Sequence, residues 1–286
     1  MRKKAIALIS GGLDSTLAVR LMLDQGIEVV GVHFTCPLFS SRPEGNRPDA
    51  AKKAADRLGI KLRVAPLEKD YIEVVRRPAH GWGQAVNPCL DCHAHMIEKA
   101  KIIMEEESAS FLVTGEVLGQ RPKSQRREAM DIIDRITETK GILLRPLSAQ
   151  HFEPTEAEKA GIVDREKLFS IEGRSRKIQM EMAKDIGIRD YPSPGGGCLL
   201  ADRSYAARVF DLFERKTEYD FDDFNILKLG RLIRLNNTVR VVVGRNEEEN
   251  TLLETHHGKV DALMEPSGFP GPSAAVLGSL GKFLSG

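Results

Sequence analysis

Short strand-like segments alternate with helix-like segments over the first two hundred residues of this 286-residue chain. Stretches of helical period separate five β candidates, which are KAIALI (4–9), EVVGVHF (28–34), KLRVAP (61–66), SFLVTG (110–115) and ILLRPL (142–147). Strands that are joined by helices pair in parallel, and the helices then cover both faces of the sheet. The alternation therefore predicts a doubly wound α/β domain with a mainly parallel sheet over residues 1–200.

The composition changes after Tyr191, where YPSPGGGC packs two prolines and three glycines into eight residues. This composition predicts a rigid, turn-forming junction. Beyond it, RSYAARVFDLFER (203–215) predicts a helix, and two β-rich runs on either side of Asn236 and Asn237 predict a hairpin. We therefore expect a small α+β C-terminal module over residues 201–286.

Charge and hydropathy limit the classes of protein to which the chain can belong. Its 42 basic and 41 acidic residues nearly cancel, so binding to a nucleic acid would need a local basic patch. No apolar run approaches the roughly 20 residues that span a bilayer, and the apolar part of the N-terminal segment is too short for a secretory signal. We expect a cytoplasmic protein with no membrane partner and, as one option, a homodimer.

The first β candidate runs into a glycine turn, LISGGLDST (8–16), and a helix is predicted directly after it. Apolar residues recur at helical spacing from Leu17 to Met22, and Gly26 stands where a C-terminal cap belongs, which places this helix at about 14–25. Such a turn presents free backbone N–H groups and the positive end of a helix dipole to an anion. Phosphate is the expected ligand, and for two glycines alone the alternative is an ordinary tight turn between a strand and a helix.

The segment SGGLDS, Ser10 to Ser15, resembles the PP-loop of the ATP pyrophosphatase superfamily, and the chain contains neither a Walker A motif nor a GxGxxG fingerprint. The resemblance implies an adenine nucleotide alpha hydrolase-like fold and cleavage of ATP between its α- and β-phosphates, with AMP attached to a substrate oxygen. It also implies Mg²⁺ beside Asp14, since this ion prefers one or two carboxylates plus phosphates. The predicted ATP-binding residues are Ser10, Gly11, Gly12, Asp14, Ser15, Thr16, His33, Gly115, Arg174 and Lys177. Of these, His33 is equally explained as a strand-end histidine with satisfied hydrogen bonds.

Two later segments carry charge near the expected ATP site. Residues 114–116, TGE, stand where this superfamily often has TGH, so Glu116 replaces a histidine. The basic residues from Arg121 to Arg127 are expected either to meet RNA phosphates or to form a solvated helix start. The three basic residues of GRSRK (173–177) are candidates for gripping a triphosphate or a substrate backbone.

The motif NPCLDC opens a predicted helix, with Asn87 as N-cap and Pro88 as the first helical residue. Cys89 and Cys92 then share one face of the first turn, where the helix dipole favours the thiolate that metal binding or nucleophilic attack requires. The alternative for this pair is two buried, small apolar residues. A further cysteine, Cys36, matches no ligand position, and we expect it to be a bystander.

Cys198 follows three glycines that leave room for a cluster or a substrate. Three thiols on a chain with a PP-loop resemble the tRNA thiolation branch of the superfamily, the 2-thiouridine and 4-thiouridine synthases. That resemblance implies a [4Fe–4S] cluster held by Cys89, Cys92 and Cys198, whose open iron can hold sulfide. Two alternatives stay open: a persulfide on Cys198 that Cys89 or Cys92 resolves, and structural Zn²⁺ with His93 or His95 as fourth ligand.

The sequence thus predicts an ATP-dependent sulfurtransferase. A uridine carbonyl oxygen of tRNA attacks the α-phosphorus of Mg·ATP, pyrophosphate leaves, and sulfur then displaces AMP; the predicted catalytic residues are Asp14, Cys89, Cys92 and Cys198. The expected partners are tRNA and a sulfur donor, either a protein or sulfide. The alternatives are a PP-loop adenylating enzyme acting on a small molecule and a noncatalytic protein that binds a nucleotide and zinc.

Overall fold

The computed structural model describes residues 3–41, 48–189, 191 and 198–278. This part of the chain divides into two compact units: residues 3–35, 48–83, 88–189 and 191 form the first, and residues 36–41, 84–87 and 198–278 form the second. Two short segments from within the first 200 residues thus belong to the same unit as the C-terminal module. Most of the predicted junction, residues 192–197, lies outside the described residues.

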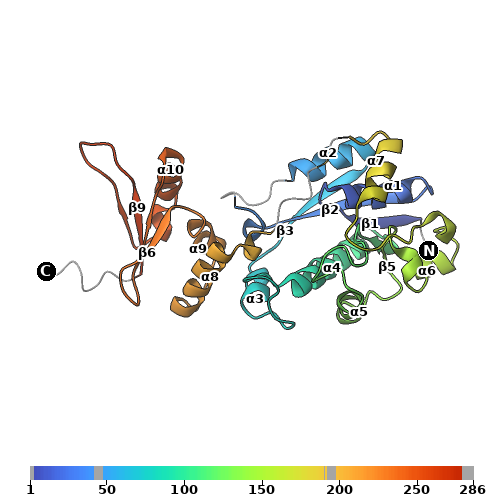
Figure 1. Cartoon of the computed structure of the whole chain (residues 1–286), viewed down its shortest axis with the longest axis horizontal. Coiled ribbons are helices and arrows are strands. Elements are labelled where there is room, and N and C mark those ends of the chain that lie inside the picture. Colours follow the sequence, from blue (N-terminus) through green and yellow to red (C-terminus); the bar gives the residue numbers. More distant parts are fainter. Residues whose placement is uncertain (1–2, 42–47, 190, 192–197, 279–286) are drawn as a thin grey trace. The chain divides into compact units, whose positions relative to one another are not determined.

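A five-stranded parallel sheet forms the centre of the first unit (Figure 1). Its strands are β1 (Lys4–Leu8), β2 (Glu28–Thr35), β3 (Lys61–Pro66), β4 (Phe111–Val113) and β5 (Leu143–Leu144), in the order β3-β2-β1-β4-β5. Ala5 in β1 lies opposite Val29 on one side and opposite Phe111 on the other, and every pairing in this sheet is parallel. The predicted sheet is confirmed, and each of the five β candidates contains a strand.

Helices cover both faces of this sheet (Figure 1). The helices α1 (Leu13–Leu23), α2 (Asp49–Leu58) and α7 (Lys177–Asp185) lie on one face, and α4 (Cys89–Glu106) and α5 (Arg127–Ile136) lie on the other. The shorter α3 (Asp70–Arg76) packs beside α4, and α6 (Glu156–Lys159) lies between two 3₁₀ turns, Ala149–His151 and Arg165–Lys167, along the chain. The doubly wound α/β fold class is therefore confirmed.

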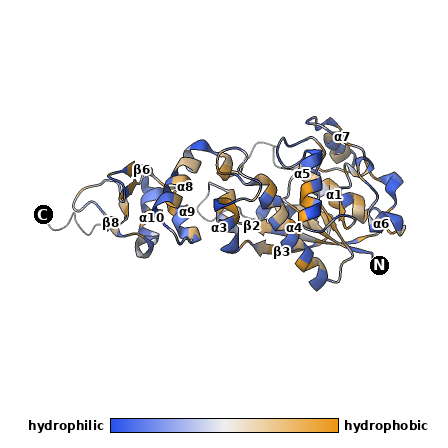
Figure 2. Cartoon of the chain, turned by 90° about the horizontal axis from the view of Figure 1, so that it is seen from below, coloured by the Kyte–Doolittle hydropathy of each residue, from blue (hydrophilic) through white to orange (hydrophobic). Residues whose placement is uncertain are grey.

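Apolar packing holds these layers together, and Figure 2 shows hydrophobic residues gathered in the sheet and in the helices on it. One buried cluster joins the sheet to α1 and α2, with Ala5 and Val113 from strands and Val19 from α1. A second cluster joins α1 to α7 through Leu17 and Ala183. This second contact places the start of α7 close to the glycine turn that precedes α1. None of the described helices is long and apolar enough to cross a membrane.

The C-terminal end of α1 closes as the sequence predicts. The N–H of Gly26 donates to the Leu23 carbonyl at 2.9 Å, and the N–H of Ile27 donates to the Met22 carbonyl at 3.1 Å. These two bonds are the Schellman pattern that satisfies the last carbonyls of a helix. Gly26 has a φ of +69°, a left-handed conformation that glycine adopts without a steric cost. The predicted cap is confirmed.

The start of α4 differs from the prediction by one residue. The helix begins at Cys89, and the carbonyl of Pro88 accepts the N–H of Cys92 at 2.8 Å, which makes Pro88 the N-cap. The prediction of Asn87 as N-cap and Pro88 as the first helical residue is therefore wrong. Proline lacks an N–H and fits either position, so the sequence did not distinguish them.

The second unit contains a four-stranded antiparallel sheet with the order β6-β7-β9-β8. Its strands are β6 (Arg231–Arg234), β7 (Arg240–Val243), β8 (Ala262–Met264) and β9 (Ala274–Leu277), and its helices are α8 (Arg203–Arg215), α9 (Phe221–Ile226) and α10 (Glu247–Thr255). Three 3₁₀ turns, Pro37–Phe39, Leu199–Ala201 and His257–Lys259, complete it. Ile226 of α9 and Leu253 of α10 pack on Val242 of the sheet. The α+β module, its first helix and the β6-β7 hairpin are confirmed.

Candidate functional site

The carboxyl ends of β1 and β4 lie side by side in the first unit. From β1 the strand order proceeds to β2 and β3 in one direction, and from β4 it proceeds to β5 in the other. Open α/β sheets bind ligands in the crevice that this change of direction leaves at the carboxyl ends of the strands. The glycine turn follows β1, and residues 114–116 follow β4, so both predicted loops border this crevice.

Hydroxyl groups brace the glycine turn from within. Ser15 Oγ donates to the Gly12 carbonyl at 3.0 Å, and Thr16 Oγ1 donates to the same oxygen at 2.9 Å. Ser10 Oγ lies 3.2 Å from Ser15 Oγ and accepts the N–H of Gly12 at 3.3 Å. No side chain of the described residues caps α1, so the N–H groups of its first turn face the crevice without a capping acceptor. These groups are suited to bind an anion.

Two predicted site glycines are required by close backbone packing. A Cβ on Gly11 would lie 2.3 Å from the carbonyl carbon of Ala50 at the start of α2, and Gly11 also has a φ of +77°. A Cβ on Gly115 would lie 2.4 Å from the backbone nitrogen of Ser15. No side chain fits at either position. The loop after β4 therefore rests directly on the first turn of α1.

Side chains from two other elements hold Asp14, the acidic residue of the turn. Gln120 Nε2 donates to Asp14 Oδ2 at 2.7 Å, and Arg176 Nη2 donates to the same oxygen at 3.2 Å. Gln179 Nε2 in turn donates to Gln120 Oε1 at 2.9 Å. Among the described residues, Asp14 Oδ1 is buried and has no hydrogen-bond partner. A buried carboxylate oxygen without a donor suits a cation, so Asp14 fits the implied Mg²⁺.

The basic residues of GRSRK differ in where the structure places them. Arg176, at the N-cap of α7, turns its guanidinium to Asp14, whereas Arg174 and Lys177 are exposed. A charge count treats the three residues alike, so the sequence predicted all three as candidates for gripping a triphosphate. It also missed Gln120, because a neutral amide carries no sequence signal of its own.

His33 and Cys36 are buried. His33 Nδ1 donates to the Ile9 carbonyl at 2.9 Å, directly before the glycine turn, and burial lowers the pKa of this imidazole, so the ring is neutral. His33 thereby supports the end of β1, and its place beside adenine stays a prediction.

In the second unit, burial raises the pKa of Cys36 to about 12, which keeps the thiol protonated and suits a bystander.

Cys89 and Cys92 lie in the first turn of α4. Cys92 is buried, and the hydroxyl of Tyr71 donates to its sulfur at 3.1 Å, whereas Cys89 is half-buried. Asp91, between them, accepts the backbone N–H of His80 at 3.1 Å and lies 2.8 Å from its ring Nδ1. The structure therefore fixes this turn through contacts with the preceding helix α3 and loop.

The described residues contain no group of three or more His, Cys, Asp or Glu side chains that could hold a metal ion. Cys89 and Cys92 belong to the first unit, and Cys198 belongs to the second. The convergence of the three thiols stays a prediction.

Glu116, which stands where a histidine was expected, lies in a buried ion cluster. Its carboxylate accepts hydrogen bonds from His93 Nδ1 at 3.0 Å, Thr114 Oγ1 at 3.1 Å and Arg145 Nε at 3.0 Å. The other nitrogens of Arg145 donate to Asp134 at 2.7 and 2.9 Å. Burial raises the pKa of Glu116, but Arg145 and His93 outweigh burial and bring this pKa to about 2. Glu116 is thus ionised and joins the loop after β4 to α4.

The basic stretch from Arg121 to Arg127 includes the start of α5. Arg127 is the first residue of that helix, donates to the His151 carbonyl at 2.6 Å and lies 4.2 Å above the ring of Phe152. This arginine therefore has a structural role. The exposed members of the stretch are Arg121, Lys123 and Arg126.

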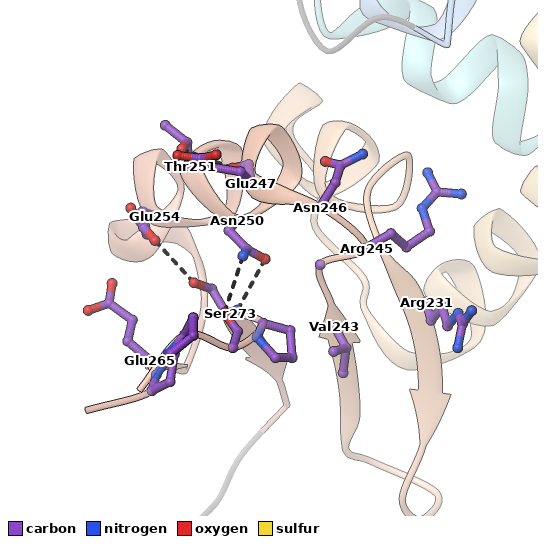
Figure 3. Close-up of a pocket in the computed structure, with 15 residues that line it drawn as sticks. Arg231, Val243, Arg245, Asn246, Glu247, Asn250, Thr251, Glu254, Glu265 and Ser273 are labelled. Atoms are coloured by element: carbon purple, nitrogen blue, oxygen red, sulfur yellow. Dashed lines mark hydrogen bonds between the residues drawn. The ribbon is translucent and has the colours of Figure 1, made fainter. Parts of the chain in front are cut away.

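A cavity of about 1100 Å³ lies in the second unit, where the end of β7, α10 and the loop before β9 meet (Figure 3). Asn250 of α10 accepts the N–H of Ser273 at 3.1 Å, and Ser273 Oγ donates to Glu254 at 3.0 Å. The charged residues of the lining are mixed in sign: Arg231, Arg245, Glu247, Glu254 and Glu265. The balance of charge does not favour an anion or a cation.

Two family models match the chain. The model described as Thiamine biosynthesis protein (ThiI) matches residues 1–157, more than half of the 286 residues. The model described as NFACT protein RNA binding domain matches residues 230–283.

Known proteins are similar to parts of the chain. A probable tRNA sulfurtransferase of Methanothermobacter thermautotrophicus is 33% identical over 120 residues, 41% of this chain and 30% of its own. A probable tRNA sulfurtransferase of a Geobacillus species is 32% identical over 146 residues, 50% of this chain and 34% of its own. The chain thus spans about a third of the length of these curated relatives. A crystal structure of a 4-thiouridine synthetase–RNA complex with bound ATP has 22% identity and a TM-score of 0.43, covering 79% of this chain and 52% of its own.

Proposed function

Because this chain belongs to the Thiamine biosynthesis protein (ThiI) family, we propose that it is an ATP-dependent sulfurtransferase that exchanges a uridine carbonyl oxygen of tRNA for sulfur. The observation that carries the proposal is the glycine turn at the end of β1. It combines a helix start without a side-chain cap and a carboxylate, Asp14, whose buried oxygen lacks a partner among the described residues. Similar proteins named as tRNA sulfurtransferases support the choice of reaction.

In the proposed reaction, the uridine oxygen attacks the α-phosphorus of ATP and pyrophosphate leaves. The N–H groups at the start of α1 donate to phosphate oxygens, and Gly11 packs the turn closely against the start of α2. These groups act by positioning the phosphates and by stabilising the charge that develops on them. When bound at Asp14, Mg²⁺ would neutralise phosphate charge. Sulfur then displaces AMP from the uridine.

Sulfur is proposed to reach the adenylated uridine through Cys198 and the two thiols at the start of α4. The hydroxyl of Tyr71 donates to the sulfur of Cys92, and a donor at this distance stabilises a thiolate. A cluster held by Cys89, Cys92 and Cys198 and a persulfide on Cys198 are the two forms of delivery.

The second unit is proposed to contact RNA. The match to an NFACT protein RNA binding domain over residues 230–283 supports this. The edge strand β6 exposes Arg231 and Arg234, with the apolar Ile233 between them. Arginine side chains bind phosphate oxygens, and an apolar side chain can lie against a base.

The test is an assay of pyrophosphate release from Mg·ATP with an unmodified tRNA transcript and sulfide as the sulfur source, together with mass spectrometry of the nucleosides. We expect both pyrophosphate and thiouridine, and we expect Asp14→Asn to slow both by about 100-fold. Asp185→Asn, on the exposed side of α7, is the matched control and should retain full activity. Pyrophosphate release that depends on a small molecule and not on tRNA would identify an enzyme of small-molecule metabolism instead.

The form of sulfur delivery is tested by iron and acid-labile sulfide analysis after anaerobic purification of the wild type and Cys198→Ala. Iron that is lost in the variant supports a cluster. Full activity of a metal-free protein rules out the cluster. Zinc without turnover supports a noncatalytic nucleotide-binding protein.

A further inference from the structure

Four side chains beside the glycine turn form one hydrogen-bonded polar cluster that is not complete. Asp14, Gln120, Arg176 and Gln179 are linked in it by direct hydrogen bonds. Within residues 3–41, 48–189, 191 and 198–278, three buried atoms of this cluster have no partner: Asp14 Oδ1, Arg176 Nε and Gln179 Oε1. Gln179 is fully buried. Because native structures rarely leave buried polar atoms unpaired, three in one cluster indicate a ligand.

The chemistry of the unpaired atoms restricts that ligand. Arg176 Nε carries a hydrogen and needs an acceptor, and a phosphate oxygen is the acceptor that guanidinium groups bind best. Asp14 Oδ1 and Gln179 Oε1 are acceptors and need a cation or a water molecule that a cation holds. A phosphate group that carries a divalent cation supplies both at once. A neutral organic ligand does not.

The packing of α7 explains why Arg176 lies here. Ala183 of α7 packs with Leu13 and Leu17 of α1, and this contact brings the start of α7 to the start of α1. Arg176 is the N-cap residue of α7, and its side chain is only 18% exposed. Its guanidinium therefore lies at the helix start where a phosphate would bind.

The bond between Arg176 and Asp14 is long for an ion pair. Arg176 Nη2 and Asp14 Oδ2 are 3.2 Å apart, whereas charge-assisted bonds of this kind are usually about 2.7–2.9 Å. Gln120 makes the shorter contact with the same oxygen, at 2.7 Å. Asp14 is thus positioned mainly by Gln120, and Arg176 is the partner that can leave.

We propose that Arg176 is a phosphate-binding residue that exchanges Asp14 for a phosphate oxygen when Mg·ATP binds. Gln120, oriented by Gln179, keeps the carboxylate of Asp14 in place for the metal during this exchange. The inference rests on the proposed ATP site, and it assigns the phosphate contact to Arg176 instead of the exposed Arg174 and Lys177.

The experiment is calorimetric titration of the full chain with ATP, in EDTA and in Mg²⁺. We expect Arg176→Gln to weaken ATP binding by about 10- to 100-fold in EDTA, the usual range for a lost hydrogen bond to a charged group. The loss should be smaller in Mg²⁺, because the variant also frees Asp14 for the metal. Asp14→Asn should remove the gain from Mg²⁺ and should not weaken binding in EDTA, because the variant frees Arg176 for the phosphate. Lys184→Gln makes the same charge change on an exposed part of α7 and should bind like the wild type.

The outcomes distinguish failure of the proposed ATP site from failure of the proposed role of Arg176. A wild type that does not bind ATP contradicts the proposed function itself. If the wild type and Arg176→Gln bind ATP with equal affinity, only the role of Arg176 is contradicted. If affinity falls only in Arg174→Gln or Lys177→Gln, the phosphate contact belongs to those residues. Thermal unfolding checks that each variant is folded. If Arg176→Gln is not folded, Arg176→Lys is measured in its place. If Arg176→Lys binds ATP in EDTA less than about threefold more weakly than the wild type, the result counts against a bidentate contact between the guanidinium and phosphate.

Discussion

Replacement of Glu116 by glutamine tests whether a buried ion cluster supports the loop between β4 and α5. The variant removes one negative charge from between Arg145 and His93 and leaves Asp134 to compensate Arg145. The pKa of Glu116 is about 2 in the folded chain against the usual 4.5. Each pH unit of such a difference corresponds to about 1.4 kcal/mol, so ionisation of Glu116 stabilises the first unit by on the order of 3 kcal/mol relative to the protonated carboxyl.

The direction in which pH changes this stabilisation follows from the direction of the pKa shift. Because the pKa of Glu116 is lower in the folded state, its contribution is fully present above the unfolded pKa of 4.5 and is lost as the pH falls toward 2. At pH 3.5, the same linkage relation leaves about 2 kcal/mol. Glu116→Gln should therefore lower the free energy of unfolding by about 3 kcal/mol at pH 7 and by about 2 kcal/mol at pH 3.5.

Urea unfolding, followed by tryptophan fluorescence, measures this difference. Trp82 is the only tryptophan of the chain and lies in the first unit, so its signal reports the unfolding of that unit. Glu105→Gln, an exposed substitution on α4, is the matched control and should stay within about 0.5 kcal/mol of the wild type. Equal stability of Glu116→Gln and wild type at pH 7, or a difference that widens as the pH falls, would refute the reasoning.

Two further predictions concern Gly115 and Cys36. Gly115→Ala places a Cβ 2.4 Å from the backbone nitrogen of Ser15, so we expect the free energy of unfolding in urea to fall by at least about 2 kcal/mol. Gly81→Ala is the control, because no atom lies within 4 Å of the added Cβ. Its free energy of unfolding should fall by only roughly 1 kcal/mol, the cost of a positive φ for alanine. Brief alkylation of the folded protein at pH 8 should leave Cys36 unmodified, because burial raises the pKa of its thiol to about 12. Mass spectrometry measures the modification, and rapid modification of Cys36 would contradict its burial.

The sheet could be predicted because its strands are short, apolar and separated by helical segments. The buried residues of β1 and β2 follow one another without alternation, which is the pattern of a parallel strand covered on both faces. The glycine turn could be predicted for a similar reason, because its shape depends on neighbouring residues. Both signals are local in the sequence, and both are confirmed by the structure where it describes them.

The partners of Asp14 could not be predicted in this way. Gln120 and Arg176 lie 106 and 162 residues further along the chain, and only the packing of α7 on α1 and of the loop after β4 brings them close. The same holds for Glu116. Its replacement of a histidine is visible in the sequence, but its partner Arg145 is 29 residues away and belongs to the segment after β5.

The loop after β4 connects the glycine turn to the helix that carries the CxxC pair. Gly115 rests on the first turn of α1, Glu116 binds His93 of α4, and Gln120 binds Asp14. This loop has few alternative conformations, because Gly115 leaves no room for a Cβ and the ionised carboxylate of Glu116 is buried. It therefore holds the start of α1 and the start of α4 in a fixed relation. In the proposed reaction, sulfur must reach the same uridine that ATP activates. This rigidity would then keep the CxxC helix in register with the proposed phosphate-binding turn.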